Sequence, residues 1–245
     1  MGVLLQHFDK TGALQVTGKS WPIAYPGVAN TPEKFYIRNA GDEASLALTL
    51  TITQVGSDDG ASMIRCALDT ATVLPPYGLA AALSAAGDGG VWAATGMQYY
   101  VLTAYNATGE TVASLEVAVN VDIATKRVTL TWSTVPGATG YKLYRTTASG
   151  SYGASSLRAT INGGGTNTYV DDGSATGAGS PPTANTTAGG APNYGSAPAL
   201  GTGPLSLGVL AVGQWACYWI NRVVPAGTPG RVTARQALRR FSEAA

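Results

Sequence analysis

The stretch that most constrains the fold of this chain is residues 128–145, VTLTWSTVPGATGYKLYR. Its first half alternates apolar with polar residues up to Trp132, which is the period-2 pattern of a β-strand with one buried face. A turn with one proline and two glycines follows, and residues 141–145 resume a strand-like composition. The sequence therefore predicts two consecutive strands joined by a short turn, with Trp132 in the core.

A second alternating stretch lies at residues 35–55, where the apolar residues at 46, 48, 50 and 52 face one side and alanine and threonines the other. Charged residues make up only 12% of the chain and the net charge is +1, so we expect no binding to nucleic acid or to an anionic membrane. No apolar run approaches the roughly 18 residues of a membrane-spanning helix. These patterns predict an all-β protein.

The length of 245 residues allows two ordinary domains. Residues 75–78 and 180–192 are rich in proline, glycine and threonine, the composition of linkers. Residues 1–34 contain three prolines and are predicted to form an extended N-terminal arm that lies across a neighbouring subunit. Because few contacts cross an exposed turn, a domain can be inserted there. We predict such an inserted domain between the two linker-like flanks.

The strand ending in Trp132, the Val-Pro-Gly-Ala-Thr-Gly turn and the Tyr-x-Leu-Tyr-Arg strand resemble the B and C strands of a fibronectin type III domain. Residues 99–110, with Tyr-x-x-x-Ala-x-Asn and a following glycine, and residues 114–121 resemble the last two strands of that fold. In this chain, residues 99–121 come before the segment 128–145 that resembles the B and C strands. Either the domain is circularly permuted, which we favour because the upstream stretch is too short for a sandwich, or residues 75–121 are a truncated repeat that donates strands.

The order Phe-x-Ile-x-Asn-x-Gly and the alternating strand after it, in residues 35–55, resemble the opening hairpin of Ig-like domains of the major-sperm-protein type. The second half of that fold is similar to residues 205–224. The resemblance implies an Ig-like β-sandwich that is discontinuous in sequence. The implied organisation is an arm at 1–34, an Ig-like sandwich at 35–75 and 200–245, a fibronectin type III-like domain at 76–186 and a linker at 187–199.

Two features stay open in the sequence. Residues 232–242 have the spacing of an amphipathic helix but also suit a closing strand, which we prefer because the sandwich needs a final strand. Cys66 and Cys217 are too few for a disulfide framework, and we expect buried reduced thiols rather than a single bond between them.

No motif supports catalysis. Gly18-Lys19-Ser20 resembles the end of a phosphate-binding loop, but Gly12 lies one residue too far upstream and no buried strand precedes it. His7 is the only histidine, and no G-x-S-x-G elbow accompanies it, so neither nucleophilic catalysis nor a histidine-based zinc site is supported. We predict no enzymatic activity, no catalytic residues, no cofactor and no metal site.

Three carboxylate pairs, Asp42-Glu43, Asp58-Asp59 and Asp171-Asp172, lie in glycine-containing turns. None has the alternating ligand spacing of a calcium loop, so we expect them to hydrogen-bond their own turns. Asn106 and Asn185 begin glycosylation sequons, which matter only in a eukaryotic secretory route.

Seven aromatic residues are candidates for a sugar-binding face, but we expect core packing first and a partner interface second. Two of them share strand parity with Cys217, as a sandwich core requires. The seven are Trp21, Tyr25, Tyr77, Trp92, Trp215, Tyr218 and Trp219.

The glycine-, alanine- and threonine-rich strands, the VPGATGYKLYR run and the phrase GQWACYWINRVVPAGT are similar to tail and baseplate components of tailed bacteriophages, over most of residues 30–230. The resemblance implies a structural virion protein assembled in the bacterial host cytoplasm. Its implied partners are other virion proteins and copies of itself, with a host surface glycan as a further candidate. The rival function is a secreted bacterial module that binds polysaccharide or a cell surface. It would need an export signal, and we expect none in this sequence, because the N-terminal apolar run is too short.

Overall fold

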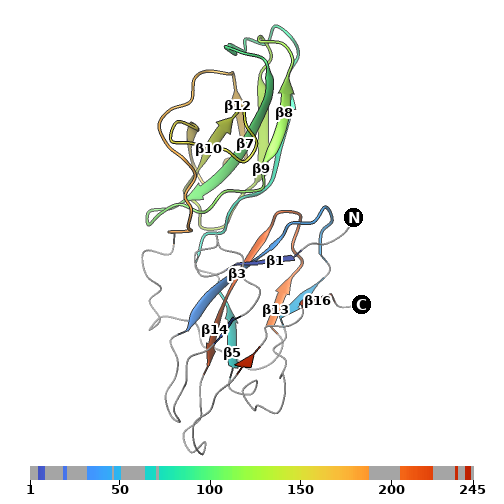
Figure 1. Cartoon of the computed structure of the whole chain (residues 1–245), viewed down its shortest axis with the longest axis vertical. Coiled ribbons are helices and arrows are strands. Elements are labelled where there is room, and N and C mark those ends of the chain that lie inside the picture. Colours follow the sequence, from blue (N-terminus) through green and yellow to red (C-terminus); the bar gives the residue numbers. More distant parts are fainter. Residues whose placement is uncertain are drawn as a thin grey trace, which may run out of the picture. The chain divides into compact units, whose positions relative to one another are not determined.

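The computed structural model of this chain describes residues 5–8, 19–20, 32–45, 47–50, 64–69, 72–187, 205–222, 235–236 and 241–243. All regular secondary structure in these residues is β-strand, which confirms the predicted all-β class. The chain forms two compact units (Figure 1): unit 1 is Met1–Thr70 together with Ala191–Ala245, and unit 2 is Ala71–Gly190. The part of the chain that the structure describes contains no helix long and apolar enough to cross a membrane.

Unit 2 is a sandwich of two antiparallel sheets. The three-stranded sheet has the order β12-β9-β6, and the four-stranded sheet has the order β11-β10-β7-β8. The strands of the first sheet are β6 (Tyr77–Leu83), β9 (Val128–Ser133) and β12 (Thr168–Asp171). Those of the second are β7 (Gly96–Tyr105), β8 (Val117–Val121), β10 (Gly140–Thr146) and β11 (Leu157–Asn162).

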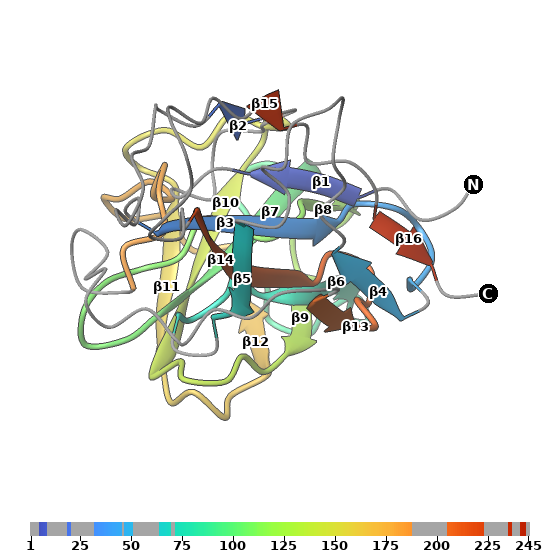
Figure 2. The same ribbon diagram turned by 90° about the horizontal axis from the view of Figure 1, so that it is seen from below.

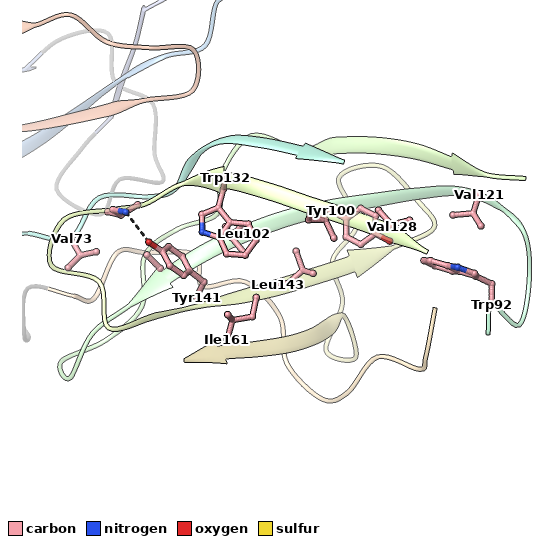
Figure 3. Packing of buried hydrophobic residues seen from close by; sticks show 13 residues of the cluster. Val73, Trp92, Tyr100, Leu102, Val121, Val128, Trp132, Tyr141, Leu143 and Ile161 are labelled. Atoms are coloured by element: carbon pink, nitrogen blue, oxygen red, sulfur yellow. Dashed lines mark hydrogen bonds between the residues drawn. The ribbon is translucent and has the colours of Figure 1, made fainter. Parts of the chain in front are cut away.

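The core of unit 2 lies between these sheets (Figure 3), and the alternation in β9 explains it. Val128 and Leu130 are fully buried and Trp132 is 5% exposed, so the prediction that Trp132 lies in the core is confirmed. Its ring meets that of Tyr141 edge-on, at 5.3 Å between centroids. The Tyr141 hydroxyl accepts a hydrogen bond from the Val135 backbone N–H at 2.9 Å, which fixes the turn between β9 and β10 to the core.

The chain enters unit 2 at Ala71 and leaves it after the segment 185–187, at what we call the near end. Asn185 Nδ2 and Thr187 Oγ1 both donate to the Val73 carbonyl, at 2.9 and 3.2 Å, so the segment closes the unit at this end. Asn106 Nδ2 donates to the Thr187 carbonyl at 3.0 Å. The amide nitrogens of both sequon asparagines are therefore structural donors.

The flanks that the sequence marks as linker-like belong in part to unit 2. Pro75 and Pro76 are buried, and β6 begins directly after them. Residues 180–187 are likewise described parts of unit 2 and end in the closing segment. The buried Pro75 and Pro76 and the closing segment 185–187 thus belong to the packed unit rather than to a flexible connection.

Unit 1 contains a four-stranded sheet with the order β1-β3-β14-β5, a three-stranded sheet with the order β13-β4-β16, and the pair β15-β2 (Figure 2). All of its paired strands are antiparallel. The first sheet consists of β1 (Leu5–Phe8), β3 (Glu33–Asn39), β14 (Trp215–Arg222) and β5 (Ile64–Leu68). The others consist of β13 (Leu205–Gly208), β4 (Leu48–Leu50), β16 (Phe241–Glu243), β15 (Arg235–Gln236) and β2 (Lys19–Ser20).

The core of unit 1 gathers apolar side chains from several of these strands. Leu48 and Leu50 are 0% and 1% exposed, as their alternation predicts, whereas positions 46 and 52 lie outside the described residues. Tyr218 and Ile220 of β14 belong to the same cluster. The alternate β14 residues Trp215, Cys217 and Trp219 are also buried, so this strand is covered on both faces.

The structure bears on three sequence-based expectations about unit 1. The N-terminal region is not a free arm throughout, because Leu5–Phe8 pairs along β3, with Leu5 opposite Asn39 and Phe8 opposite Tyr36. Near the C-terminus, Arg235–Gln236 and Phe241–Glu243 are strands, which is the preferred alternative for that region. Cys66 and Cys217 are buried and form no disulfide, as expected.

Candidate binding site at the far end of unit 2

The end of unit 2 opposite its chain connections, which we call the far end, carries a pocket. The loops 84–95, 122–127, 147–156 and 172–180 meet there because the strands are antiparallel. Backbone bonds join these loops; Val91 N–H, for example, donates to the Asp172 carbonyl at 2.6 Å. The pocket has a volume of about 580 Å³ and draws its lining from three of these loops and from the ends of β7 and β10.

Asp171 forms the base of this region. The residue is 0% exposed, and its carboxylate accepts hydrogen bonds from Arg145 Nη1 at 2.8 and 3.0 Å and from Arg158 Nε at 2.6 Å. The Tyr100 hydroxyl donates to it at 3.0 Å and the Gly173 N–H at 3.0 Å. Burial, together with the Asp171 carboxylate, raises the pKa of Tyr100, so its hydroxyl stays protonated and acts as a donor.

Asp172 extends the network towards solvent. It accepts hydrogen bonds from the hydroxyl and backbone N–H of Ser174, and Arg158 Nη2 donates to it at 2.6 Å. The hydrogen bonds from Ser174, with the Arg158 charge, lower the pKa of Asp172 to about 2. Arg145 and Arg158 thus face Asp171 and Asp172, and the four charges cancel.

Trp92 seals the core beneath the pocket. Its ring is 7% exposed, its Nε1–H donates to the Lys126 carbonyl at 2.8 Å, and the Arg145 guanidinium carbon lies 4.7 Å from the ring centroid. Gly173 packs against the same ring with φ of 91°, and a Cβ there would lie 2.5 Å from it. Position 173 therefore requires glycine, for conformation and for space.

Gln98 lies near the start of β7 and lines the pocket. It shares strand parity with Tyr100, Leu102 and Ala104, which are core residues, and it is only 4% exposed. No side-chain hydrogen bond joins its amide to any residue in the described range 72–187. Gln98 is therefore a mostly buried residue whose amide is open to the pocket and has no hydrogen-bond partner within that range.

The residues singled out in the sequence lie elsewhere, apart from Asp171, Asp172 and Trp92. Asp42 and Glu43 are exposed, and Lys19–Ser20 is a short strand paired with β15. His7 belongs to β1, but its side chain is outside what the structure describes. Outside the described residues also lie Gly12, Trp21, Tyr25, Asp58 and Asp59. Within the described residues, no group of His, Cys, Asp and Glu side chains is arranged to hold a metal ion.

The aromatic residues in the described part of the chain are mostly core residues. Trp92, Trp215, Tyr218 and Trp219 are buried, and Tyr77 is partly buried. This agrees with core packing as the first expectation and leaves no exposed ring platform among these five.

Unit 1 holds a buried ion pair beside its tryptophans. Lys34 Nζ lies 2.8 Å from Asp69 Oδ2, with the two side chains 5% and 4% exposed, and 4.9 Å from the centroid of the Trp219 ring. Burial and the Asp69 charge raise the pKa of the Cys217 thiol well above its usual value, so this thiol is a poor nucleophile. The arrangement is one of structural support.

Sequence reasoning did not find the pocket, although two signals were present. Gln98 and Arg145 both occupy core-facing positions in strands, where a polar residue needs a partner or a ligand. The pairing of Arg145 and Arg158 with Asp171 was not visible, because the partners are 26 and 13 residues apart in sequence.

Comparison of the chain with protein-family models, with curated protein sequences and with solved structures finds no match.

Proposed function

We propose that this protein is a structural component of a tailed-bacteriophage virion, associated with the tail or baseplate, which acts through protein–protein contacts without catalysis. The observation that carries the proposal is the way unit 2 is inserted. Both chain connections lie at its near end, where the segment 185–187 closes the unit. The far end of unit 2 carries neither chain connection, and unit 1 keeps its own core.

The surface of the far end supports a role in contacts. Val91, Met97 and Ile123 are 61%, 42% and 43% exposed, although each is apolar. All three belong to the far-end loops or to the start of β7, so this end of the unit offers apolar side chains for contacts. The charged groups beneath them are paired with one another, which suits a rigid contact surface better than acid–base chemistry.

The finer fold assignment is part of the same proposal. A three-stranded sheet β12-β9-β6 facing a four-stranded sheet β11-β10-β7-β8 supports a fibronectin type III-like arrangement with permuted strand order, because β7 and β8 precede β9 in the chain. For unit 1 we keep the Ig-like assignment as a proposal on the strength of its two facing sets of antiparallel strands.

The test is the composition of purified particles. Mass spectrometry of virions from a phage that encodes this chain should detect it in several copies per particle. A phage whose copy lacks residues 71–190 should show whether unit 2 is needed for assembly or for contacts outside the particle. Absence of the full-length protein from purified virions would contradict the proposal and favour a secreted polysaccharide-binding module.

A further inference from the structure

We propose that the far-end pocket of unit 2 binds a neutral sugar residue, with the Gln98 amide as its central hydrogen-bonding group. The virion proposal assigns no ligand to this pocket, and the sugar site does not depend on where the protein is located. The pocket volume of about 580 Å³ lies within the roughly 300–1,000 Å³ of small-molecule sites.

Gln98 is the observation that points to a ligand. Its side chain is 4% exposed and lines the pocket, and its amide has no hydrogen-bond partner among residues 72–187. A polar group that makes no hydrogen bond within the protein is left to pair with water or with a ligand. A primary amide offers two N–H donors and a carbonyl acceptor, which is the combination that a vicinal pair of sugar hydroxyls satisfies.

Arg145 is the one charged residue in the pocket lining, and because it is already paired within the network beside the pocket, the site favours an uncharged ligand. Arg145 donates through Nη1 to Asp171 and through Nη2 to the Ser174 carbonyl, at 2.6 Å for the latter. The Arg158 guanidinium forms ion pairs with both Asp171 and Asp172. An anion would have to displace a buried carboxylate from its guanidinium partners, and a cation would meet no unpaired carboxylate.

The rim of the pocket supplies further hydroxyl groups. Thr147, Ser155 and Thr176 line it, and their side chains make no hydrogen bonds within residues 72–187. A protein hydroxyl can donate or accept a hydrogen bond, so it can pair with a sugar hydroxyl that acts in either role. Ala94 and Ala175, with short side chains, leave the room that a pyranose ring needs.

A peptide ligand is disfavoured by the backbone next to the pocket. Peptides that bind by adding a strand need an open sheet edge. The start of β11 is already covered, because Gly177 N–H donates to the Leu157 carbonyl at 2.6 Å and Leu157 N–H donates to the Gly179 carbonyl at 3.2 Å. The pocket therefore offers side-chain hydroxyls and an amide rather than a free strand edge.

The test is saturation-transfer difference NMR on the full-length protein. The probes are the methyl glycosides of glucose, galactose, mannose, rhamnose and N-acetylglucosamine, with methyl glucuronide and a capped tetra-alanine peptide as the anionic and peptide arms. At least one neutral glycoside should bind, with a dissociation constant of about 1 mM, as expected for a single sugar ring. If no neutral glycoside receives saturation, or if only the glucuronide or the peptide does, the proposal is overturned.

Variants then locate the binding. Gln98→Ala removes the amide and should weaken binding at least tenfold; a modest fall in melting temperature is expected from the lost packing of this buried side chain, with the cooperative transition retained. Ala175→Trp fills the pocket from its exposed rim and should abolish binding. Ala107→Trp places the same bulk on an exposed near-end turn and should bind as the wild type does. Undiminished binding by both pocket variants would place the ligand elsewhere and refute the site.

Discussion

Asp171 receives hydrogen bonds from two guanidinium groups, a phenol and a backbone amide, although no part of it is exposed to solvent. Taking a carboxylate and its partners out of water is costly, and only complete hydrogen bonding offsets that cost. A single residue therefore holds together β7, β10, β11 and the loop after β12.

Replacing Asp171 should be strongly destabilising. Asp171→Leu is expected to lower the free energy of unfolding by about 3–5 kcal/mol, because it leaves the Arg145 and Arg158 guanidinium groups buried beside an apolar side chain. Urea unfolding of the full chain measures the change. Asp88→Ala, at an exposed loop position, is the control and should stay within about 0.5 kcal/mol of wild type. A similarly small effect for Asp171→Leu would show that the network is not structural.

The pKa of Asp172 predicts a pH dependence. Because the folded-state pKa of about 2 lies below the ordinary value of 3.8, the carboxylate contributes stability above about pH 4, and this contribution is lost as the pH falls towards 2. The side chain is 38% exposed, so solvent screening keeps the effect within about 1 kcal/mol. Melting temperatures between pH 5 and pH 2 should fall less steeply for Asp172→Asn than for wild type; equal slopes would contradict the assignment.

At the scale of elements, β9 joins the two sheets through Trp132. Trp132→Ala should cost about 3–5 kcal/mol, the range for a large aromatic residue leaving a core cavity. Trp132→Phe should cost much less than that, because the buried indole Nε1–H has no hydrogen-bond partner in unit 2 and its removal also removes an unsatisfied donor. Chemical denaturation of both variants tests the pair. Equal losses would mean that the N–H is bonded after all.

The strand β1 covers one edge of β3. Deleting residues 1–8 removes the pairing from Leu5–Asn39 to Phe8–Tyr36 and exposes the backbone N–H and C=O groups of β3. We expect a lower melting temperature and concentration-dependent self-association, since an uncovered edge strand pairs with other chains. Light scattering after size exclusion measures the association. A truncated protein that stays monomeric and equally stable would restore the free-arm interpretation for these residues.

Strands were predictable from the sequence where one face is buried and the other is not. β4 and β9 read correctly because their apolar residues alternate. β14 does not alternate in this way, because Trp215 to Ile220 are buried on both faces of the strand. The sequence therefore did not show which residues cover its second face. The far-end pocket was also beyond prediction, because loops distant in sequence build it and no local pattern records which loops meet.

At the scale of the whole molecule, the two units have separate cores. All residues of the larger cluster, from Val73 to Ile161, lie in unit 2, and those of the other cluster, from Phe35 to Ile220, lie in unit 1. A core that draws on one unit only is expected to fold with that unit alone.

Removal of unit 2 tests this independence. Replacing residues 71–190 with a short Gly/Ser linker should leave unit 1 with a cooperative thermal transition, and the excised fragment 71–190 should show its own. Calorimetry of the two pieces and of the intact chain provides the comparison. Loss of cooperative unfolding in both pieces would mean that the units depend on each other for folding.

The two connections at the near end have an evolutionary consequence. Because the chain enters and leaves unit 2 side by side, with Asn185 and Thr187 both bonded to Val73, the gene segment for this unit can be exchanged by recombination at two nearby points of the fold. A replacement domain would need only to form equivalent hydrogen bonds between its first and last residues at the near end. Far-end loops can then diversify without changing the closure at the near end or the separate core of unit 1.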